Sequence, residues 1–479
     1  MTRYVPTIGL EIHVQLSTRT KMFCGCELSF GDAPNIHTCP TCLGLPGALP
    51  VVNAQAIESA IRIGLALGCE IAPVSQFHRK NYFYPDNPKA YQISQYDVPI
   101  CAGGRLGDVR IHRAHVEEDA AKLVHSGAGS GRIHDAERSV VDFNRAGTPL
   151  VEIVTEPDVH SPEQAREWLT LLRETIRALG VSDVDMSQGS LRCDANVSVA
   201  PEGSTELGTK TELKNMNSFA FLERGVRAEI ERQIALLDAG GTVVQETLHY
   251  DPGTGELTPL RSKEEAHDYR YFPEPDLPVL RVSTEQVAAA RAALPELPAD
   301  RARRYVDSLG LAADRAHELA FIPARGAFFE VALGAGAPDL DPVALANWIP
   351  LLVERIGADT DPATSQVAPA ALAQLSTMVA TKAISRDAGR TVLDRLVAEG
   401  GDPAAIVEAE GLGAISADDG GLAKIVAAAI AADPDAAEKV RAGNAKAMGP
   451  LVGSVMKQTK GRADGGEVGR LIREQLGQS

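Results

Sequence analysis

The stretch "IGLEIHVQLS", residues 8–17, carries an apolar side chain at every second position. The apolar positions are Ile8, Leu10, Ile12, Val14 and Leu16, and the positions between them are Gly9, Glu11, His13 and Gln15. Alternation with a period of two is typical of a β-strand that buries one face. We therefore predict a strand near the N-terminus whose polar face presents a carboxylate beside an imidazole.

The same one-sided pattern recurs in four later stretches. They are "RIHRAHVEEDAAK" (110–122), "TPLVEIVTEPD" (148–158), "SLRCDANVSVA" (190–200) and "GTKTELKN" (208–215). Their polar positions include Glu117, Glu118, Asp119, Glu152, Arg192, Asp194, Asn196, Lys210, Glu212 and Lys214. Strands with one polar and one apolar face are typical of antiparallel sheets. We predict an α+β fold built on a largely antiparallel sheet with one polar face.

This polar face has an unusual chemistry. An ordinary solvated sheet face carries scattered Thr, Lys and Ser, whereas carboxylates and imidazoles dominate here. A cluster of Glu11, His13, Glu152 and one of the neighbours Glu117 and Glu118 requires a balancing cation, because like charges in a cleft raise one another's pKa. Mg²⁺ takes oxygen ligands and often serves substrate phosphates. The pattern predicts a phosphate-handling metal site, and the alternative is a merely wet face.

Four cysteines stand in two close pairs within "FCGCELSFGDAPNIHTCPTCLG", residues 23–44. The spacing of Cys24, Cys26, Cys39 and Cys42 suits a closed tetrahedral zinc site with a structural role. His37 could replace one cysteine, and a redox pair at Cys39 and Cys42 is the alternative. We expect the other cysteines to be core residues: Cys69, Cys101 and Cys193.

Aromatic and cationic residues are interleaved in two segments, "HRKNYFYPDNPKAYQISQYD" (78–97) and "RSKEEAHDYRYFPEPD" (261–276). The first holds four tyrosines and a phenylalanine beside Arg79, Lys80 and Lys89. Such segments suit stacking on a base or on the aminoacylated end of an RNA. The alternative is a loop packed by its own aromatic rings.

The chain has 479 residues and a net charge of −17. Its length predicts several domains, and a shift to Ala-rich helical sequence after "YFPEPDLPVL" places boundaries near residues 290 and 400. We expect an α+β domain over 1–290, an all-α domain over 291–400 and a small helical tail domain over 401–479. No secretory signal or membrane-spanning stretch is visible, so we expect a cytoplasmic protein. An acidic chain argues against indiscriminate binding of nucleic acid.

The tail is locally basic, with eight Lys and Arg between residues 439 and 473 against two acidic residues. By charge alone this favours a solvated helix face. Several familiar motifs are absent from the sequence: no G-x-x-x-x-G-K-[ST] phosphate loop, no strand followed by G-x-G-x-x-G, no G-x-S-x-G and no H-E-x-x-H. The Gly-rich "GAGSGR" (127–132) has neither the spacing nor the setting of a phosphate loop.

Taken together, these motifs resemble the GatB family, the B subunits of bacterial aspartyl/glutamyl-tRNA amidotransferases. The resemblance rests on "IGLEIHVQL", "CPTCLGLPGALPVVN", "RKNYFYPDNPKAYQISQYD", "HVEEDAAK", "VDFNRAGTPLVEIVTEPD", "GSLRCDANVSV", "KTELKNMNSF" and "KEEAHDYRYFPEPDLP", in that order, with "VGSVMKQTKGRADGGEVGRLI" in the tail. Ala121 departs from the glycine usual in the family.

The resemblance implies a heterotrimer in which the partners are a glutaminase of the amidase type and a small third subunit. ATP would phosphorylate the side-chain carboxylate of misacylated Glu-tRNA(Gln) or Asp-tRNA(Asn), and ammonia from glutamine would displace the phosphate. It implies a cradle domain with a zinc-binding insertion, a helical domain and a tail domain, and it makes the basic tail a plausible tRNA surface.

The polar strand faces and the resemblance together indicate the candidate site residues. A Mg²⁺ site would comprise Glu11, His13, Glu118 (or Glu117) and Glu152, and structural Zn²⁺ would be held by Cys24, Cys26, Cys39 and Cys42. Candidates for ATP phosphates, further metal or incoming ammonia are Arg192, Asp194, Asn196, Lys210, Glu212 and Lys214. Two rival hypotheses are a non-catalytic zinc-bearing tRNA-binding scaffold and a stand-alone ligase that makes a small amide. The carboxylate cluster argues against the first, and the basic helical tail argues against the second.

Overall fold

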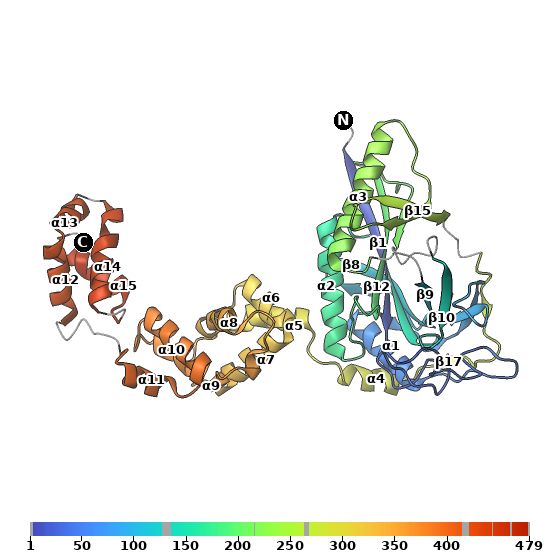
Figure 1. Ribbon diagram of the computed structural model, residues 1–479, viewed down its shortest axis with the longest axis horizontal. Coiled ribbons are helices and arrows are strands. Elements are labelled where there is room, and N and C mark those ends of the chain that lie inside the picture. Colours follow the sequence, from blue (N-terminus) through green and yellow to red (C-terminus); the bar gives the residue numbers. More distant parts are fainter. Residues whose placement is uncertain are drawn as a thin grey trace. The chain divides into compact units, whose positions relative to one another are not determined.

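The computed structural model describes residues 3–126, 136–214, 216–262, 268–413, 421–442, 444–459 and 462–477. It divides into two compact units, Met1–Leu297 and Pro298–Ser479. The "GAGSGR" segment, Lys263, His267 and Lys460 lie outside the described residues. The first unit holds every strand of the described chain and the second is helical, so the expected α+β class is confirmed (Figure 1).

A large mixed sheet organises the first unit, and β1 (Tyr4–Gln15) lies near its centre. The strand order is β15-β14-β13-β12-β1-β11-β8-β6-β2, and β7 also pairs with β8. Every pairing is antiparallel except that of β13 with β14. Their bounds are β2 (Glu70–Ile71), β6 (Cys101–Ala102), β7 (Arg105–Leu106), β8 (Val109–Glu118), β11 (Pro149–Thr155), β12 (Leu191–Pro201), β13 (Thr211–Lys214), β14 (Glu246–Tyr250) and β15 (Leu257–Ser262).

The apolar face of this sheet is covered by helices. The four predicted apolar residues within β1, and Leu16 directly after it, are at most 3 % exposed, because they face the main core. Helix α1 (Ala54–Ala66) contacts β8, and α3 (Phe219–Asp238) contacts β12 and α2 (Pro162–Leu179). Ser161 caps α2, and Trp168 of that helix donates to the Leu106 carbonyl oxygen at 2.9 Å. The polar face is therefore the one left for a site.

Three short sheets complete the described part of the unit. Strands β4 (His78–Asn81), β5 (Tyr91–Ser94) and β16 (Phe272–Pro273) form one of them in the order β16-β4-β5. The other two pair β9 (Lys122–Ser126) with β10 (Arg138–Asp142) and β3 (Val74–Ser75) with β17 (Leu280–Arg281). Strand β5 also contacts β8. Both aromatic segments predicted from sequence thus meet in the sheet formed by β4, β5 and β16.

The remaining helix of the first unit is α4 (Thr284–Ala292), and the second unit begins with α5 (Pro298–Leu309). It continues with α6 (Ala313–Phe321), α7 (Pro323–Ala335), α8 (Pro342–Ile356), α9 (Pro369–Ala380), α10 (Arg386–Glu399), α11 (Pro403–Glu410), α12 (Gly421–Ala432), α13 (Pro434–Arg441), α14 (Met448–Gln458) and α15 (Gly465–Gln475), with 3₁₀ turns at Pro362–Thr364 and Ala445–Ala447. Two separate apolar clusters lie in it, one over 305–396 and one over 422–476. Within the described residues, no helix has the length and apolar character needed to span a bilayer.

Candidate active site

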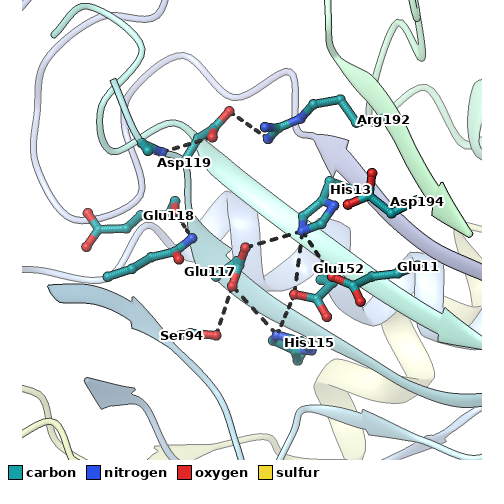
Figure 2. Close-up of polar contacts among 12 residues, drawn as sticks. Glu11, His13, Ser94, His115, Glu117, Glu118, Asp119, Glu152, Arg192 and Asp194 are labelled. Carbon is teal, nitrogen blue, oxygen red and sulfur yellow. Dashed lines mark hydrogen bonds and ion pairs between the residues drawn. The ribbon is translucent and has the colours of Figure 1, made fainter. Parts of the chain in front are cut away.

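A row of polar side chains crosses four neighbouring strands of the large sheet. In register, Arg192 of β12 lies opposite His13 of β1, His13 lies opposite Glu152 of β11, and Glu152 lies opposite His115 of β8. Side chains at directly opposed positions emerge on the same face of a sheet. The antiparallel register therefore brings residues that are distant in the sequence into one row, and Figure 2 shows His13, Glu152 and His115 converging while Arg192 is directed toward Asp119.

Two imidazoles and three carboxylates form the centre of this row. The Nε2 atom of His13 lies 3.9 Å from Glu11, 3.8 Å from Glu117 and 3.6 Å from Glu152. The Nε2 atom of His115 lies 3.8 Å from Glu117 and 3.4 Å from Glu152. We call these five residues the acid–imidazole cluster. It contains two sets of possible metal ligands, and within each set the donor atoms lie within 4.8 Å of one another. One set is Glu11, His13 and Glu152, and the other is His115, Glu117 and Glu152. Glu152 belongs to both sets.

Burial and charge set the protonation of the cluster. Burial would raise the pKa of Glu152, but His115, His13 and Lys80 hold it well below its usual range. Burial would also raise the pKa of Glu117, but Lys80 and His115 lower it. The pKa of Glu11 is raised by burial and by Glu152. The cationic groups nearby therefore stabilise the charged forms of Glu117 and Glu152 more than that of Glu11.

Glu118 does not join this cluster, contrary to the first expectation from sequence. Its Oε1 atom accepts from the Ile93 backbone N–H at 2.9 Å and from the Lys89 ammonium. Glu117 takes its place, and its Oε2 atom accepts from the Ser94 hydroxyl at 3.0 Å. The physical reason is strand parity: Glu117 follows the polar face of β8, while Glu118 falls on the opposite face (Figure 2).

Two flanking groups carry most of the other predicted residues. On one side the Arg192 guanidinium donates to Asp119 at 2.9 Å, and although burial would lower the pKa of Arg192, Asp119 raises it. On the other side the Lys214 ammonium lies 2.8 Å from Asp194 and 3.4 Å from Glu212. These pairs bring cations close to the acid–imidazole cluster.

Two predicted residues lie less centrally. Asn196 lies opposite Gly9 of β1 and Glu212 of β13, on the same polar face. Lys210 precedes β13 and is exposed. The structure thus places Asn196 beside Glu212 on the polar face, outside the row through His13, and leaves Lys210 at the surface.

A cavity of about 1410 Å³ opens beside the cluster. Its polar wall includes Glu11, His13, Glu152, Glu212 and Lys214. Its other residues come largely from the two aromatic segments: Lys80, Asn81, Tyr82, Phe83, Tyr84, Tyr96, Tyr269, Arg270, Tyr271 and Phe272. A cavity of this size exceeds a typical small-ligand pocket of about 300–1,000 Å³. It has room for a nucleotide together with part of a second substrate.

The four predicted cysteines lie together as a separate group. The Sγ atoms of Cys24, Cys26, Cys39 and Cys42 are all within 4.8 Å of one another. A hydrogen bond with Cys24 and, to a smaller extent, the charge of Lys21 lower the pKa of Cys42 to about 4. His37 is not part of this group, because its Nε2 atom lies 2.8 Å from Asp32. Four converging sulfur atoms fit a closed zinc site.

The other three cysteines are Cys69, Cys101 and Cys193, and each is buried, as predicted. Their thiols contribute to the core. Burial raises the pKa of Cys69 to about 12, which keeps its thiol neutral.

Two members of the site, His115 and Lys80, are not predicted in these roles from the sequence. His115 is 2 % exposed and is separated from Glu117 by the core residue Val116. The alternation of Ala114 and Val116 with His115 and Glu117 was available in the sequence and would have assigned both to the polar face. The sequence predicted Lys80 only as part of a segment that stacks on RNA. Its approach to Glu117 depends on how the sheet that contains β4 packs on the sheet that contains β8.

Comparisons with known proteins show to which family the chain is similar. Residues 6–288 match the model of the GatB/GatE catalytic domain, and residues 327–476 match that of the GatB domain. The chain is 50% identical to the B subunit of the aspartyl/glutamyl-tRNA(Asn/Gln) amidotransferase from Anaeromyxobacter sp. (strain K), over 98% of each chain. It is also 50% identical to the protein of the same name from Frankia casuarinae, over 100% of this chain and 97% of the relative. The corresponding protein of Brevibacillus brevis is 47% identical over 99% of both.

Proposed function

The chain belongs to the GatB family of tRNA-dependent amidotransferase B subunits, and from this premise we propose which reaction its site performs. ATP phosphorylates the side-chain carboxylate of Glu-tRNA(Gln) or Asp-tRNA(Asn), and ammonia then displaces the phosphate. The observation that carries the proposal is the acid–imidazole cluster, of which Glu11, His13 and Glu152 line a cavity with room for a nucleotide and part of a second substrate.

The chemistry balances without a covalent enzyme intermediate. An oxygen of the substrate carboxylate attacks the γ-phosphorus of ATP, and ADP leaves. The nitrogen of ammonia then attacks the acyl carbon, inorganic phosphate leaves with the former carboxylate oxygen, and the nitrogen loses a proton. Such transfers depend on positioning and charge neutralisation rather than on a protein nucleophile. Burial of the cluster also protects an acyl phosphate from water.

We assign the divalent cation to Glu11, His13 and Glu152, with His115 and Glu117 completing the surrounding charge. When bound, Mg²⁺ supplies Lewis acidity toward phosphate oxygens. Lys80 and Lys214 line the same cavity and are our candidates for neutralising phosphates. Arg192, Asp194, Asn196, Lys210 and Glu212 remain candidates for ATP, further metal or ammonia. Asp119 and Asp194 position Arg192 and Lys214 through their ion pairs.

We extend the proposal to the rest of the chain. The partners would be an amidase-type glutaminase and a small third subunit, working in the cytoplasm. Zn²⁺ at the four clustered cysteines would brace an insertion in a cradle-shaped catalytic domain over 1–290, followed by a helical domain over 291–400 and a tRNA-binding tail over 401–479. In the tail, Lys439, Arg441, Lys446, Lys457, Arg462 and Arg473 are candidate phosphate contacts. Arg470 is already paired with Glu467 and Glu474.

Substrate-dependent ATP turnover tests this function. The complex reconstituted with both partner proteins is given ATP and Mg²⁺ without glutamine, and ADP release is followed with misacylated tRNA, with uncharged tRNA and with free glutamate. The proposal predicts ADP release only with misacylated tRNA. ADP release with free glutamate would favour a stand-alone ligase, and no ADP release with any substrate would favour a non-catalytic scaffold.

A further inference from the structure

Four exposed aromatic side chains line the cavity outside the acid–imidazole cluster. Phe83 is 85 % exposed, Tyr84 49 %, Tyr96 40 % and Phe272 43 %. We call these four residues the aromatic rim. Single exposed apolar residues are common, but a group of large rings around one cavity marks a binding surface. The cluster assigned to catalysis uses none of them.

The backbone behind the rim is held rigidly. The Asn81 side-chain amide donates to the carbonyl oxygens of Tyr269 and Arg270, at 3.1 and 2.9 Å, and the Asn81 backbone N–H also donates to Tyr269 at 3.0 Å. Arg270 adopts a φ of 45°, in the left-handed region that side chains other than glycine seldom occupy. The Asn81 bonds offset the cost of that conformation, so the turn before Phe272 is fixed in advance of binding.

A second contact fixes Phe272 itself. The Arg79 guanidinium donates two hydrogen bonds to Glu274, at 2.8 and 2.9 Å, and a third to Asp276 at 3.0 Å. Arg79 also lies over the Tyr91 ring at 4.1 Å and near the Phe272 ring at 5.8 Å. A guanidinium under an aromatic ring strengthens a stacking surface for electron-rich heterocycles.

The rings differ in how much of their surface is already used. Tyr96 stacks on Tyr271 at 4.5 Å with an interplanar angle of 10°, so one of its faces is covered. Phe83 has no ring or cation partner within the described residues. It is the most exposed ring of the rim and therefore the one with most to gain from a stacking partner.

We propose that the aromatic rim binds the unpaired nucleotides at the 3′ end of the transfer RNA by base stacking. This inference rests on the proposed function, and it adds the recognition site. Stacking tolerates any base, and aromatic rings interleaved with cations are the usual platform for single-stranded RNA. Several exposed rings exceed what one adenine of ATP can cover. The aromatic rim is exposed and the acid–imidazole cluster is buried. Nucleotides stacked on the rim therefore stay at the cavity mouth while the amino-acid carboxylate reaches inward.

Binding of two RNAs to the complex with both partner proteins tests the inference. The probes are fluorescently labelled uncharged tRNA(Gln) and the same RNA lacking its unpaired 3′ nucleotides, at one fixed salt concentration. The variants are Phe83→Ala, Phe83→Leu and Phe83→Trp. The matched control is Phe30→Ala, since Phe30 is 75 % exposed and does not line the cavity. The KM for ATP is measured in parallel.

We expect Phe83→Ala to weaken binding of intact tRNA by about 5- to 150-fold, the range found for loss of one base–ring stack. Phe83→Leu should weaken it similarly because it lacks a π-face, and Phe83→Trp should restore it. The truncated RNA and the control variant should show no such loss. Three outcomes would overturn this inference and leave the proposed function standing. They are an equal loss of affinity for both RNAs, full tRNA affinity with Phe83→Leu, and a raised KM for ATP with unchanged tRNA affinity. Failure of the unsubstituted complex to bind tRNA would overturn the proposed function as well.

Discussion

Replacement of Glu117 by glutamine isolates the charge on which the site depends. Both carboxylate oxygens of Glu117 lie 3.8 Å from an imidazole Nε2 atom, one at His13 and the other at His115. Glutamine keeps the shape and the hydrogen bond from Ser94 but removes the negative charge. A unit positive charge about 4 Å from this carboxylate, in an effective dielectric constant of about 20, interacts with it by about 4 kcal/mol. If most of that is lost in the transition state, the phosphorylation rate falls by about 10²- to 10³-fold.

The assay separates the two half-reactions of the complex. Glutamine hydrolysis is measured first, and ADP release with misacylated tRNA in the absence of glutamine is measured second. We expect Glu117→Gln to leave glutamine hydrolysis and thermal stability near those of the unsubstituted complex while ADP release collapses.

Glu118→Gln is the matched control, because it removes the neighbouring charge from the other face of β8. Its carboxylate pairs with Lys89, and both side chains are nearly buried, at 6 % exposure for Glu118 and 10 % for Lys89. Removing one partner of a buried pair costs about 3–5 kcal/mol of stability. We therefore expect a lower Tm and ADP release within about tenfold of normal. If Glu118→Gln abolished ADP release while Glu117→Gln retained it, our placement of the two carboxylates would be wrong.

Three further predictions concern stability and metal content. The purified chain should carry about one zinc ion, and Cys39→Ser should lose it and lower the Tm, as measured by elemental analysis and calorimetry; equal zinc in both proteins would contradict the four-cysteine site. Arg79→Lys keeps the charge but cannot reproduce the two-pronged contact with Glu274, which is 3 % exposed, so urea unfolding should show a loss of about 1.5–3 kcal/mol; an unchanged midpoint would show that the pair is dispensable. Arg110 lowers the pKa of Asp158 to about 2 from an ordinary value of 3.8, so this carboxylate stabilises the fold above about pH 4 and ceases to do so as pH falls toward 2. Asp158→Asn should therefore cost up to about 1 kcal/mol near neutral pH and nothing near pH 2, and a loss independent of pH would refute the assignment.

Local periodicity predicted much of the sheet and part of the site. The alternation in residues 8–17 identified the buried and polar faces of β1 without exception, because the side-chain period of a strand leaves no freedom once one face is buried. The spacing of the four cysteines predicted their convergence for a similar reason, since two short pairs and one loop limit the possible geometry.

Local sequence patterns could not predict contacts between segments that are distant in the sequence. The pair formed by Arg79 and Glu274 joins residues 195 positions apart, and nothing in either segment specifies the other. The choice between Glu117 and Glu118 required the parity of β8, whose register with β11 shifts at a bulge between Val154 and Thr155. The parity of β8 changes at that bulge, so the exposed Arg110 and His112 before it do not predict the polar face, whereas the buried Ala114 and Val116 after it do.

Transfer of an oxygen isotope tests the central claim most directly. The complex would amidate Glu-tRNA(Gln) whose side-chain carboxylate carries ¹⁸O, with unlabelled ATP and glutamine, and the inorganic phosphate would be analysed by mass spectrometry. If the carboxylate is phosphorylated and ammonia displaces the phosphate, each phosphate released carries one oxygen from the labelled carboxylate. Phosphate without the label, formed alongside labelled amide product, would contradict the phosphorylation of the carboxylate that we assign to this site.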